Sequence, residues 1–290
     1  MSINKIILPL LFVLLTSCSL NQERIKVLSF NIRYDNPSDG ENSWSNRKYM
    51  VTDLIHSVYP DVMGMQEATH RQFSDLGAIL PEYARSGVGR DDGKERGEYA
   101  AILYKKIEFN LLDESTFWLS EHPDDTGSIS WGAHLPRVVS WVKLEEKKTK
   151  KVFYVFNTHF SHVSDSAKMQ SARLLISKIN IIANGKPVIL TGDFNFTNES
   201  KGYAILTEKT SDAAGLTDAQ FASETPHFGG NVTYNGFGTV EDGKKIDFVF
   251  VNHSFTVLQH GIYPIHEKDH YISDHYPVFS ELEFRQGAPD

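Results

Sequence analysis

The chain has 290 residues, 40% of them hydrophobic, which is enough to bury the core of one large domain or two small ones and excludes a disordered chain. Acidic residues outnumber basic ones by 37 to 29, giving a formal charge of −8, and the sequence has no basic stripe of the kind that tracks a long nucleic acid. The one run rich in lysine, 145–151, carries both signs of charge between two apolar segments and predicts a hairpin turn.

The first segment, 1–17, is expected to be an export signal. Its apolar stretch, Ile6 to Leu15, is too short to span a membrane as a finished helix. The residues Leu15-Thr16-Ser17-Cys18 resemble a bacterial lipobox, in which the cysteine is lipidated and becomes the mature N-terminus. We therefore expect a lipoprotein signal peptide at 1–17, a short tether at 18–24, and an exported protein that is lipid-anchored to a bacterial membrane facing the periplasm or the cell surface. The alternative is an ordinary signal peptide that contains a cysteine.

Removal of this segment has two consequences for the mature chain. Lys5 is lost with it, so the formal charge changes from −8 to −9. Cys18 is the only cysteine, so an internal disulfide is excluded and the core alone must stabilise the exported domain.

Apolar, β-branched and aromatic runs predict eight strands, at 25–31, 61–67, 100–104, 138–142, 152–159, 188–192, 246–251 and 278–284. Mixed polar and apolar patterns predict amphipathic helices at 46–59, 70–80 and 165–183. No repeat or linker separates these elements, so a single domain at 25–286 is expected. Early alternation of strands and helices, followed by β-rich stretches, predicts an α/β fold with mixed sheets.

Polar groups gather at five strand boundaries. They are Asn31, Gln66-Glu67, Asn157-Thr158-His159, Asp193-Phe194-Asn195 and Ser273-Asp274-His275. Each group alone is more typical of a cap or a turn. Five together predict ligand binding in the crevice beyond the strand ends. Their acids and amides suit a hard cation, and their histidines suit proton transfer.

These groups, in this order, resemble the motifs of the exonuclease-endonuclease-phosphatase superfamily. The matching motifs are Asn31 within SFNIRY, Gln66-Glu67, Asn157-Thr158-His159, Gly192-Asp193-Phe194-Asn195, Ile246-Asp247-Phe248-Val249-Phe250 and Ser273-Asp274-His275. The resemblance covers nearly the whole mature chain, from residue 26 to about 284. It implies a four-layer sandwich, with two packed mixed β-sheets flanked by helices. It also implies hydrolysis of a phosphoester bond by metal-activated in-line attack.

The resemblance assigns metal binding to three residues. Glu67 matches the principal metal carboxylate, Asn31 lies beside it, and Asp274 completes or approaches the site. The implied cofactor is Mg²⁺ or Mn²⁺, because carboxylate and amide oxygens suit a hard octahedral cation. Arg33 occupies a place where some members carry an acid, which puts a second metal position on that strand in doubt.

Catalytic roles carry over to five residues. His275 matches the histidine that abstracts a proton from the attacking water or contacts the scissile phosphate, and Asp247 matches the carboxylate that orients it. Asp193 is expected to position or deprotonate water, and Asn195 to donate a hydrogen bond to the phosphoryl oxygen. His159 matches a second histidine that donates to a phosphoryl oxygen or to the leaving group.

Five further residues are expected to bind substrate. Glu98 and Arg137 resemble positions that support the second histidine and contact phosphate, as an always-charged planar guanidinium does well. The others are Asn157, His162 and Arg33.

The expected function is that of an exported phosphoesterase. A compact substrate is favoured, such as a phosphorylated sugar or inositol, a lipid headgroup or a short nucleotide, because the chain is acidic. The alternatives are a secreted nuclease acting on DNA or RNA and a non-catalytic surface lipoprotein that binds a ligand. Nucleic acid is possible but not favoured, and no protein partner can be read. The loops expected to select the substrate are 35–47, 88–96, 120–134 and 221–235.

A competing motif lies at His266-Glu267-Lys268-Asp269-His270, which fits H-E-x-x-H. On a helix this pattern would supply two zinc ligands and a general base. Pro264 and Pro277 leave little room for such a helix, so a metalloprotease is disfavoured.

Overall fold

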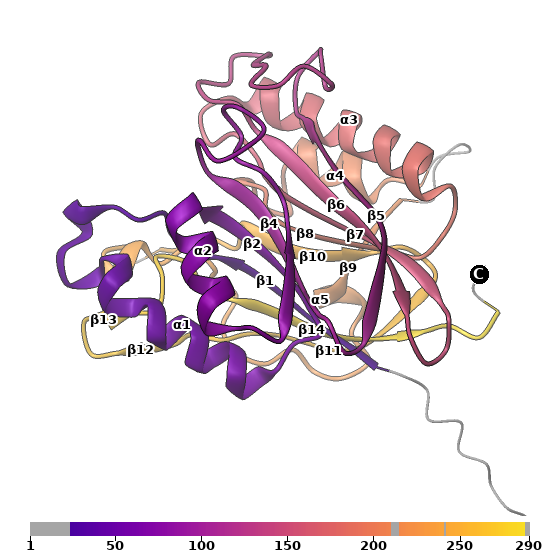
Figure 1. Cartoon of the computed structure of the whole chain (residues 1–290). Coiled ribbons are helices and arrows are strands. Elements are labelled where there is room, and N and C mark those ends of the chain that lie inside the picture. Colours follow the sequence, from indigo (N-terminus) through magenta and orange to yellow (C-terminus); the bar gives the residue numbers. More distant parts are fainter. Residues whose placement is uncertain (1–23, 210–214, 241, 288–290) are drawn as a thin grey trace, which may run out of the picture.

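The computed structural model describes residues 24–209, 215–240 and 242–287. Figure 1 shows two packed β-sheets between two layers of helices. The predicted α/β four-layer sandwich is therefore confirmed. The signal peptide, Cys18 and all but the last residue of the predicted tether lie outside the described residues. Within those residues, no helix combines the length and the apolar character needed to cross a membrane.

The first sheet has six strands in the order β11-β14-β1-β2-β4-β3. Their bounds are β1 (Arg24–Asn31), β2 (Val62–Ala68), β3 (Tyr83–Ser86), β4 (Tyr99–Lys105), β11 (Phe255–Ile262) and β14 (Val278–Phe284). β1 and β2 are parallel and every other neighbouring pair is antiparallel. Helices α1 (Trp44–Val58) and α2 (His70–Ile79) cover the outer face. A capping box formed by Thr69 and Gln72 begins α2.

The second sheet also has six strands, in the order β5-β6-β7-β8-β10-β9. Their bounds are β5 (Phe109–Trp118), β6 (Val138–Glu146), β7 (Val152–His159), β8 (Val188–Asp193), β9 (Thr217–Asp218) and β10 (Asp247–Val251). β7 and β8 are parallel, and every other neighbouring pair in this sheet is antiparallel. Helices α3 (Asp165–Ala183) and α4 (Lys201–Thr207) cover the outer face. The short helix α5 (Ala219–Ala222) follows β9, and short 3-10 helices lie at η1 (Pro37–Asn42) and η2 (Gly236–Gly238).

The space between the sheets is apolar along most of its length and polar near the strand ends. In β1, Val27 joins the core between the sheets, whereas Leu28 and Phe30 face the helices. Near the ends, the Asn157 amide nitrogen donates to the backbone oxygens of Met65 and Ala101, in the opposite sheet, at 2.9 and 2.8 Å. These polar contacts fix the position of one sheet against the other.

Each of the eight predicted strands and three predicted helices is present, with ends shifted by a few residues. The predicted hairpin is confirmed, because β6 ends at Glu146 and the antiparallel β7 begins at Val152. Strands β3, β5, β9, β11, β12 and β13 were not predicted. In β5 only the two ends are buried, so its sequence shows no apolar alternation.

The H-E-x-x-H segment does not form a helix. It forms a two-stranded hairpin, β12 (His266–Glu267) and β13 (His270–Tyr271), in which Glu267 pairs with His270. The helical spacing on which zinc binding by this motif depends is therefore lost, and the metalloprotease alternative is wrong.

Candidate active site

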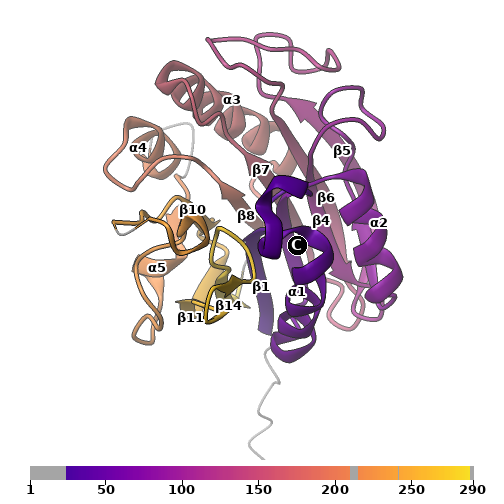
Figure 2. The same ribbon diagram turned by 90° about the vertical axis from the view of Figure 1, so that its left-hand side faces the viewer.

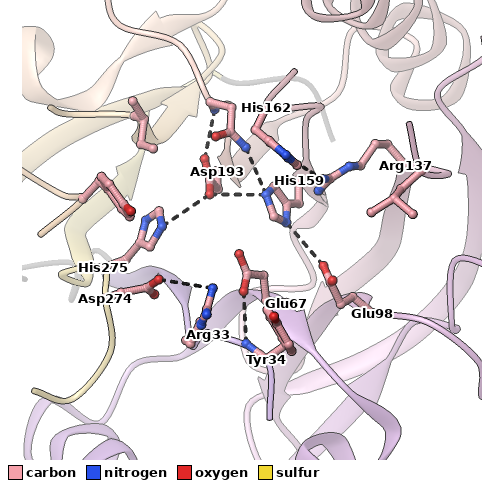
Figure 3. A pocket seen from close by; sticks show the side chains of 14 residues that line it. Arg33, Tyr34, Glu67, Glu98, Arg137, His159, His162, Asp193, Asp274 and His275 are labelled. Carbon is pink, nitrogen blue, oxygen red and sulfur yellow. Dashed lines mark hydrogen bonds and ion pairs between the residues drawn. The ribbon is translucent and has the colours of Figure 1, made fainter. Parts of the chain in front are cut away.

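A pocket of about 490 Å³ opens where the carboxyl ends of β1, β2, β7 and β8 meet. Figure 3 shows its charged side chains converging from both sheets. It is lined by Arg33, Tyr34, Glu67, Glu98, Leu135, Arg137, His159, His162, Asp193, Asn195, Tyr234, Ile246, Asp274 and His275. Ten of the thirteen residues predicted for the site line this pocket, which we call the catalytic pocket.

Glu67 reaches the pocket through an unusual backbone conformation. Its φ angle is 63°, in the left-handed region, at an irregularity in the pairing of β2 with β4. Both carboxylate oxygens are held: Oε1 accepts from Asn31 Nδ2 and Oε2 from the backbone N–H of Tyr34, each at 3.0 Å. The strained backbone at Glu67 and the two N–H donors fix the carboxylate in the pocket before any ligand binds.

Asn31 bridges the acids of the two sheets. Its amide nitrogen donates to Glu67 and, at 2.9 Å, to Asp193 Oδ2, while its oxygen accepts from the backbone N–H of Arg33 at 3.0 Å. The predicted metal-ligand role would need that oxygen to face the acids. In this geometry Asn31 orients the two carboxylates, and its role as a metal ligand stays a prediction.

His275 forms a buried pair with Asp247. Its Nδ1 lies 2.8 Å from Asp247 Oδ2, and its Nε2 lies 3.8 Å from Asp193 Oδ2. Burial alone lowers the pKa of His275, but Asp247 and Asp193 outweigh it and hold that pKa well above its usual value. The imidazole is thus held in its charged form, with Nε2–H directed towards the pocket.

Asp193 stands between the two histidines, as Figure 3 shows. Its Oδ1 accepts from the backbone N–H of Asn195 at 2.9 Å. Burial, together with the nearby charge of Asp247, raises the pKa of Asp193 to about 7. A carboxyl group with that pKa can exchange a proton near neutral pH.

His159 is neutral and oriented by Asn195. The Asn195 amide nitrogen donates to the backbone oxygen of Phe160 at 3.1 Å and to His159 Nε2 at 3.0 Å, which places the imidazole proton on Nδ1. Burial, with the positive charges of Arg137 and Arg90, lowers the pKa of His159 well below its usual value. Its Nδ1 faces Glu98 Oε2 at 3.8 Å.

Arg137 offers a buried donor without a partner among the described residues. Its Nη2 contacts His162 Nδ1 at 3.2 Å, whereas its Nη1 is buried and unpaired. The neighbouring Glu98 is occupied by a two-point ion pair with Arg90, at 2.7 and 2.9 Å. Arg137 is therefore the guanidinium that remains available to an anion in the pocket.

Arg33 and Asp274 lie together on the other side of the pocket. Arg33 has a φ angle of 55° and is clamped by Asp39 through Nε and Nη2, at 3.0 and 3.1 Å. Its Nη1 then lies 3.6 Å from Asp274 Oδ2. Some members of the family carry an acid at the place of Arg33. In this chain the Arg33 guanidinium instead adds positive charge to this side of the pocket.

Asn157 does not bind substrate, so that prediction is wrong. Its side chain is fully buried between the sheets. Besides its two donated bonds, its oxygen accepts from Gln66 and Thr191, at 2.6 and 3.0 Å. Asp247 and Asn31 also lie behind the pocket wall, where they orient residues that line it.

Several pocket residues were missed by sequence reasoning. Tyr234 packs against the His275 ring, with centroids 5.1 Å apart, and was not assigned to the site. Tyr34, Leu135, Ile246 and the supporting Arg90 were not assigned to the site. Tyr34 is the last residue of the SFNIRY motif, so its proximity to Asn31 could have indicated it. The apolar side chains of Leu135 and Ile246 carry no chemical signal.

The donor set fits a hard divalent cation. Atoms of Glu67, His159 and Asp193 lie within 4.8 Å of one another. Burial raises the pKa values of Asp193 and Asp274, and neighbouring carboxylates raise them further. Such crowded negative charge is what a bound cation would neutralise, and carboxylate oxygens suit Mg²⁺ or Mn²⁺.

Known proteins match the chain over most of its length. Residues 28–275 match the model of the Endonuclease/Exonuclease/phosphatase family. A solved endonuclease/exonuclease/phosphatase from Bacteroides vulgatus is 42% identical, with a TM-score of 0.87 over 91% of this chain and 100% of that chain. A mannosyl-6-phosphatase from Bacteroides thetaiotaomicron is 34% identical, with a TM-score of 0.81 over 90% of this chain and 100% of that chain.

An uncharacterised mimivirus protein, L388, is 26% identical over 275 residues, covering 88% of this chain and 98% of its own length. The family match, the shared sandwich and the two structures above 30% identity lead to one conclusion: the chain belongs to the endonuclease/exonuclease/phosphatase family, whose members are hydrolases that act on phosphoester bonds and use divalent metals.

Proposed function

We propose that the protein is an exported, Mg²⁺- or Mn²⁺-dependent phosphoesterase that acts on a compact phosphoester, with a phosphorylated sugar as the favoured substrate. One observation carries the proposal. A fixed carboxylate, a charged imidazole and an unpaired guanidinium converge on the catalytic pocket, from Glu67, His275 and Arg137. These are the groups needed to hold a phosphoryl group and stabilise charge that develops on it.

Glu67 would hold the cation, with Asp274 beside it. The cation, when bound, supplies Lewis-acid stabilisation of charge on the phosphoryl oxygens. Arg137 lines the same pocket, and its unpaired Nη1 would donate to a second phosphoryl oxygen. The His159 Nδ1–H faces Glu98, so His159 would help to position Glu98 on the same side of the pocket.

His275 and Asp193 would divide the proton chemistry between them. His275 is held positive by Asp247, so its Nε2–H suits donation to a phosphoryl oxygen. Asp193, with a pKa of about 7, suits acceptance of a proton from the attacking water. This assignment selects phosphate contact, rather than proton abstraction, from the two roles predicted for His275.

The compact substrate is supported by charge and by one relative. The chain is acidic, and Glu67, Glu98, Asp193 and Asp274 all face the pocket. A long polyanion would need several cationic contacts beyond it. The similarity to a mannosyl-6-phosphatase favours a phosphorylated hexose among the compact candidates.

We expect kcat/KM on a hexose 6-phosphate to exceed that on duplex or single-stranded DNA by at least about tenfold at about 0.15 M salt. The measurement is a metal-supplemented hydrolysis screen that also includes inositol phosphates, lipid headgroups and short nucleotides. Duplex cleavage as efficient as the best small substrate would overturn the proposal in favour of a secreted nuclease. Absence of turnover on every phosphoester would favour a non-catalytic binding protein.

We also propose that the protein is anchored to a membrane through lipidated Cys18, on the strength of the lipobox-like sequence. Cys18→Ala should move the protein from the membrane to the soluble fraction, because a single lipid signal is then lost. The measurement is partitioning of both forms after cell fractionation. Unchanged partitioning would argue against the lipobox.

A further inference from the structure

A second pocket, of about 430 Å³, lies outside the machinery described above. It is lined by Thr197, Asn198, Glu199, Gln220, Phe221, Asn231, Lys244 and Lys245. Two of these residues, Phe221 and Asn231, belong to the segment 221–235, one of the four loops predicted to select the substrate. Figure 2 shows α4 and α5 on one side of the molecule with β10 between them, which is the region from which this wall is built.

The second pocket shares its wall with the catalytic pocket. Along the chain, Ile246 lines the catalytic pocket and the adjacent Lys245 lines the second one. In the same way, Asn195 lines the catalytic pocket and Thr197, two residues further on, lines the second pocket. Since neighbouring Cα atoms are about 3.8 Å apart, the two pockets adjoin at these two segments of the chain.

The wall is held in place by internal contacts. Lys245 Nζ lies 3.3 Å from Asp218 Oδ2, which is buried, so its charge is neutralised within the protein. Gln220 Nε2 donates to Asn231 Oδ1 at 2.8 Å. This bond leaves the Gln220 oxygen as an acceptor and the Asn231 nitrogen as a donor, both on residues that line the pocket.

Phe221 gives the pocket an aromatic face. Its side chain is 66% exposed, so it does not serve as a core residue. An exposed ring beside carboxamides and a threonine hydroxyl offers one apolar plane and several groups that both donate and accept hydrogen bonds. A sugar ring presents the matching chemistry, with an apolar C–H face and hydroxyls around its edge.

The charges of the second pocket disfavour a nucleic acid strand. Lys244 is the one cation lining it without an acidic partner among the described residues, and Glu199 lines the same pocket. A strand passing from the catalytic pocket would place further phosphates here, and these would require several cations. A neutral sugar requires none.

We propose that the second pocket is a subsite for a neutral sugar, and that the substrate is a phosphorylated oligosaccharide whose phosphosugar occupies the catalytic pocket. The inference rests on the proposed phosphoesterase function and specifies its substrate class. The neighbouring sugar stacks on Phe221 and is held by Gln220 and Asn231.

The test compares mannose 6-phosphate with the same phosphosugar linked to a second mannose, under metal-supplemented conditions. We expect kcat/KM to be about tenfold higher for the disaccharide, because an additional apolar face is buried. In Phe221→Ala the ratio between the two substrates should fall to about one. Ile181→Ala is the matched control, since Ile181 is a 72% exposed apolar residue on α3 and the ratio should be unchanged.

Binding of unphosphorylated mannobiose, followed by saturation-transfer NMR, provides a readout independent of turnover. The signal should be present in the wild-type protein and in Ile181→Ala, and lost in Phe221→Ala. Equal kcat/KM on the two phosphosugars, without mannobiose binding, would overturn the subsite and leave the phosphoesterase function standing. No turnover of either phosphosugar, with single-stranded DNA cleavage weakened by Phe221→Ala, would overturn both and identify Phe221 as a platform for nucleobases.

Discussion

Replacing Glu67 with Gln should abolish tight binding of Mg²⁺ or Mn²⁺ and lower kcat/KM by about 10²-fold or more. The substitution removes a charge while keeping the side chain's shape. Both Glu67 oxygens accept from N–H donors. The amide nitrogen of a Gln would therefore place its own N–H group facing one of these donors, and one hydrogen bond would be lost. Calorimetric titration with each metal, alongside kinetics, measures the two effects separately.

Glu114→Gln is the matched control, because Glu114 is exposed in the middle of β5. This variant should bind metal and turn over substrate as the wild-type protein does. The wild-type protein in excess chelator should lose activity and regain it when metal is restored. Full activity of Glu67→Gln, or of the chelated protein, would remove Glu67 from the metal site.

His275→Ala should lower kcat by about 10²-fold or more with a modest change in KM. Its Nε2–H faces the pocket, and a donor whose bond strengthens as charge builds on the phosphoryl group acts mainly in the transition state. The variant also leaves Asp247 buried without its partner, which destabilises the fold. Thermal unfolding should therefore be measured together with the kinetics.

The comparison for His275→Ala is His266→Ala, because His266 is exposed on the β12–β13 hairpin. The same truncation there should leave kcat unchanged. The double variant His275→Ala/Asp247→Ala also removes the buried carboxylate that the single variant leaves unpaired. If its thermal stability recovers and its kcat does not, the loss of kcat is due to catalysis and not to folding. If only substrate affinity were lost and kcat stayed intact, His275 would not act by stabilising the transition state.

The fold and most of the pocket were predictable because their signals are local. Strands that are buried on both faces give continuous apolar runs, and Asp193 or Glu67 directly after such a run is conspicuous. β5 gives no such signal, since its central residues face solvent. A buried strand is easy to recognise from its apolar run. A strand such as β5, which makes few apolar contacts, has no such run in its sequence.

Depth was the part that could not be predicted. Asn157 and His159 are two residues apart on β7 and leave the same face of the strand, yet His159 at the strand end lines the catalytic pocket and Asn157 is buried against the opposite sheet. How far the second sheet reaches decides which of the two is covered. The second pocket was hidden for a related reason, since Thr197, Phe221 and Lys244 come from separate segments, and packing alone brings them together.

The polar contacts between the sheets constrain how this chain can change by mutation. Gly64 lies so close to the opposite sheet that an added Cβ would sit 1.9 Å from Thr191 Oγ1 and 2.6 Å from Asn157 Oδ1. Any side chain there would push the sheets apart and separate Glu67 from Asp193. Divergence into new specificities is therefore expected to spare this seam and to accumulate in the loops above it, where a changed residue alters what is bound without altering the chemistry.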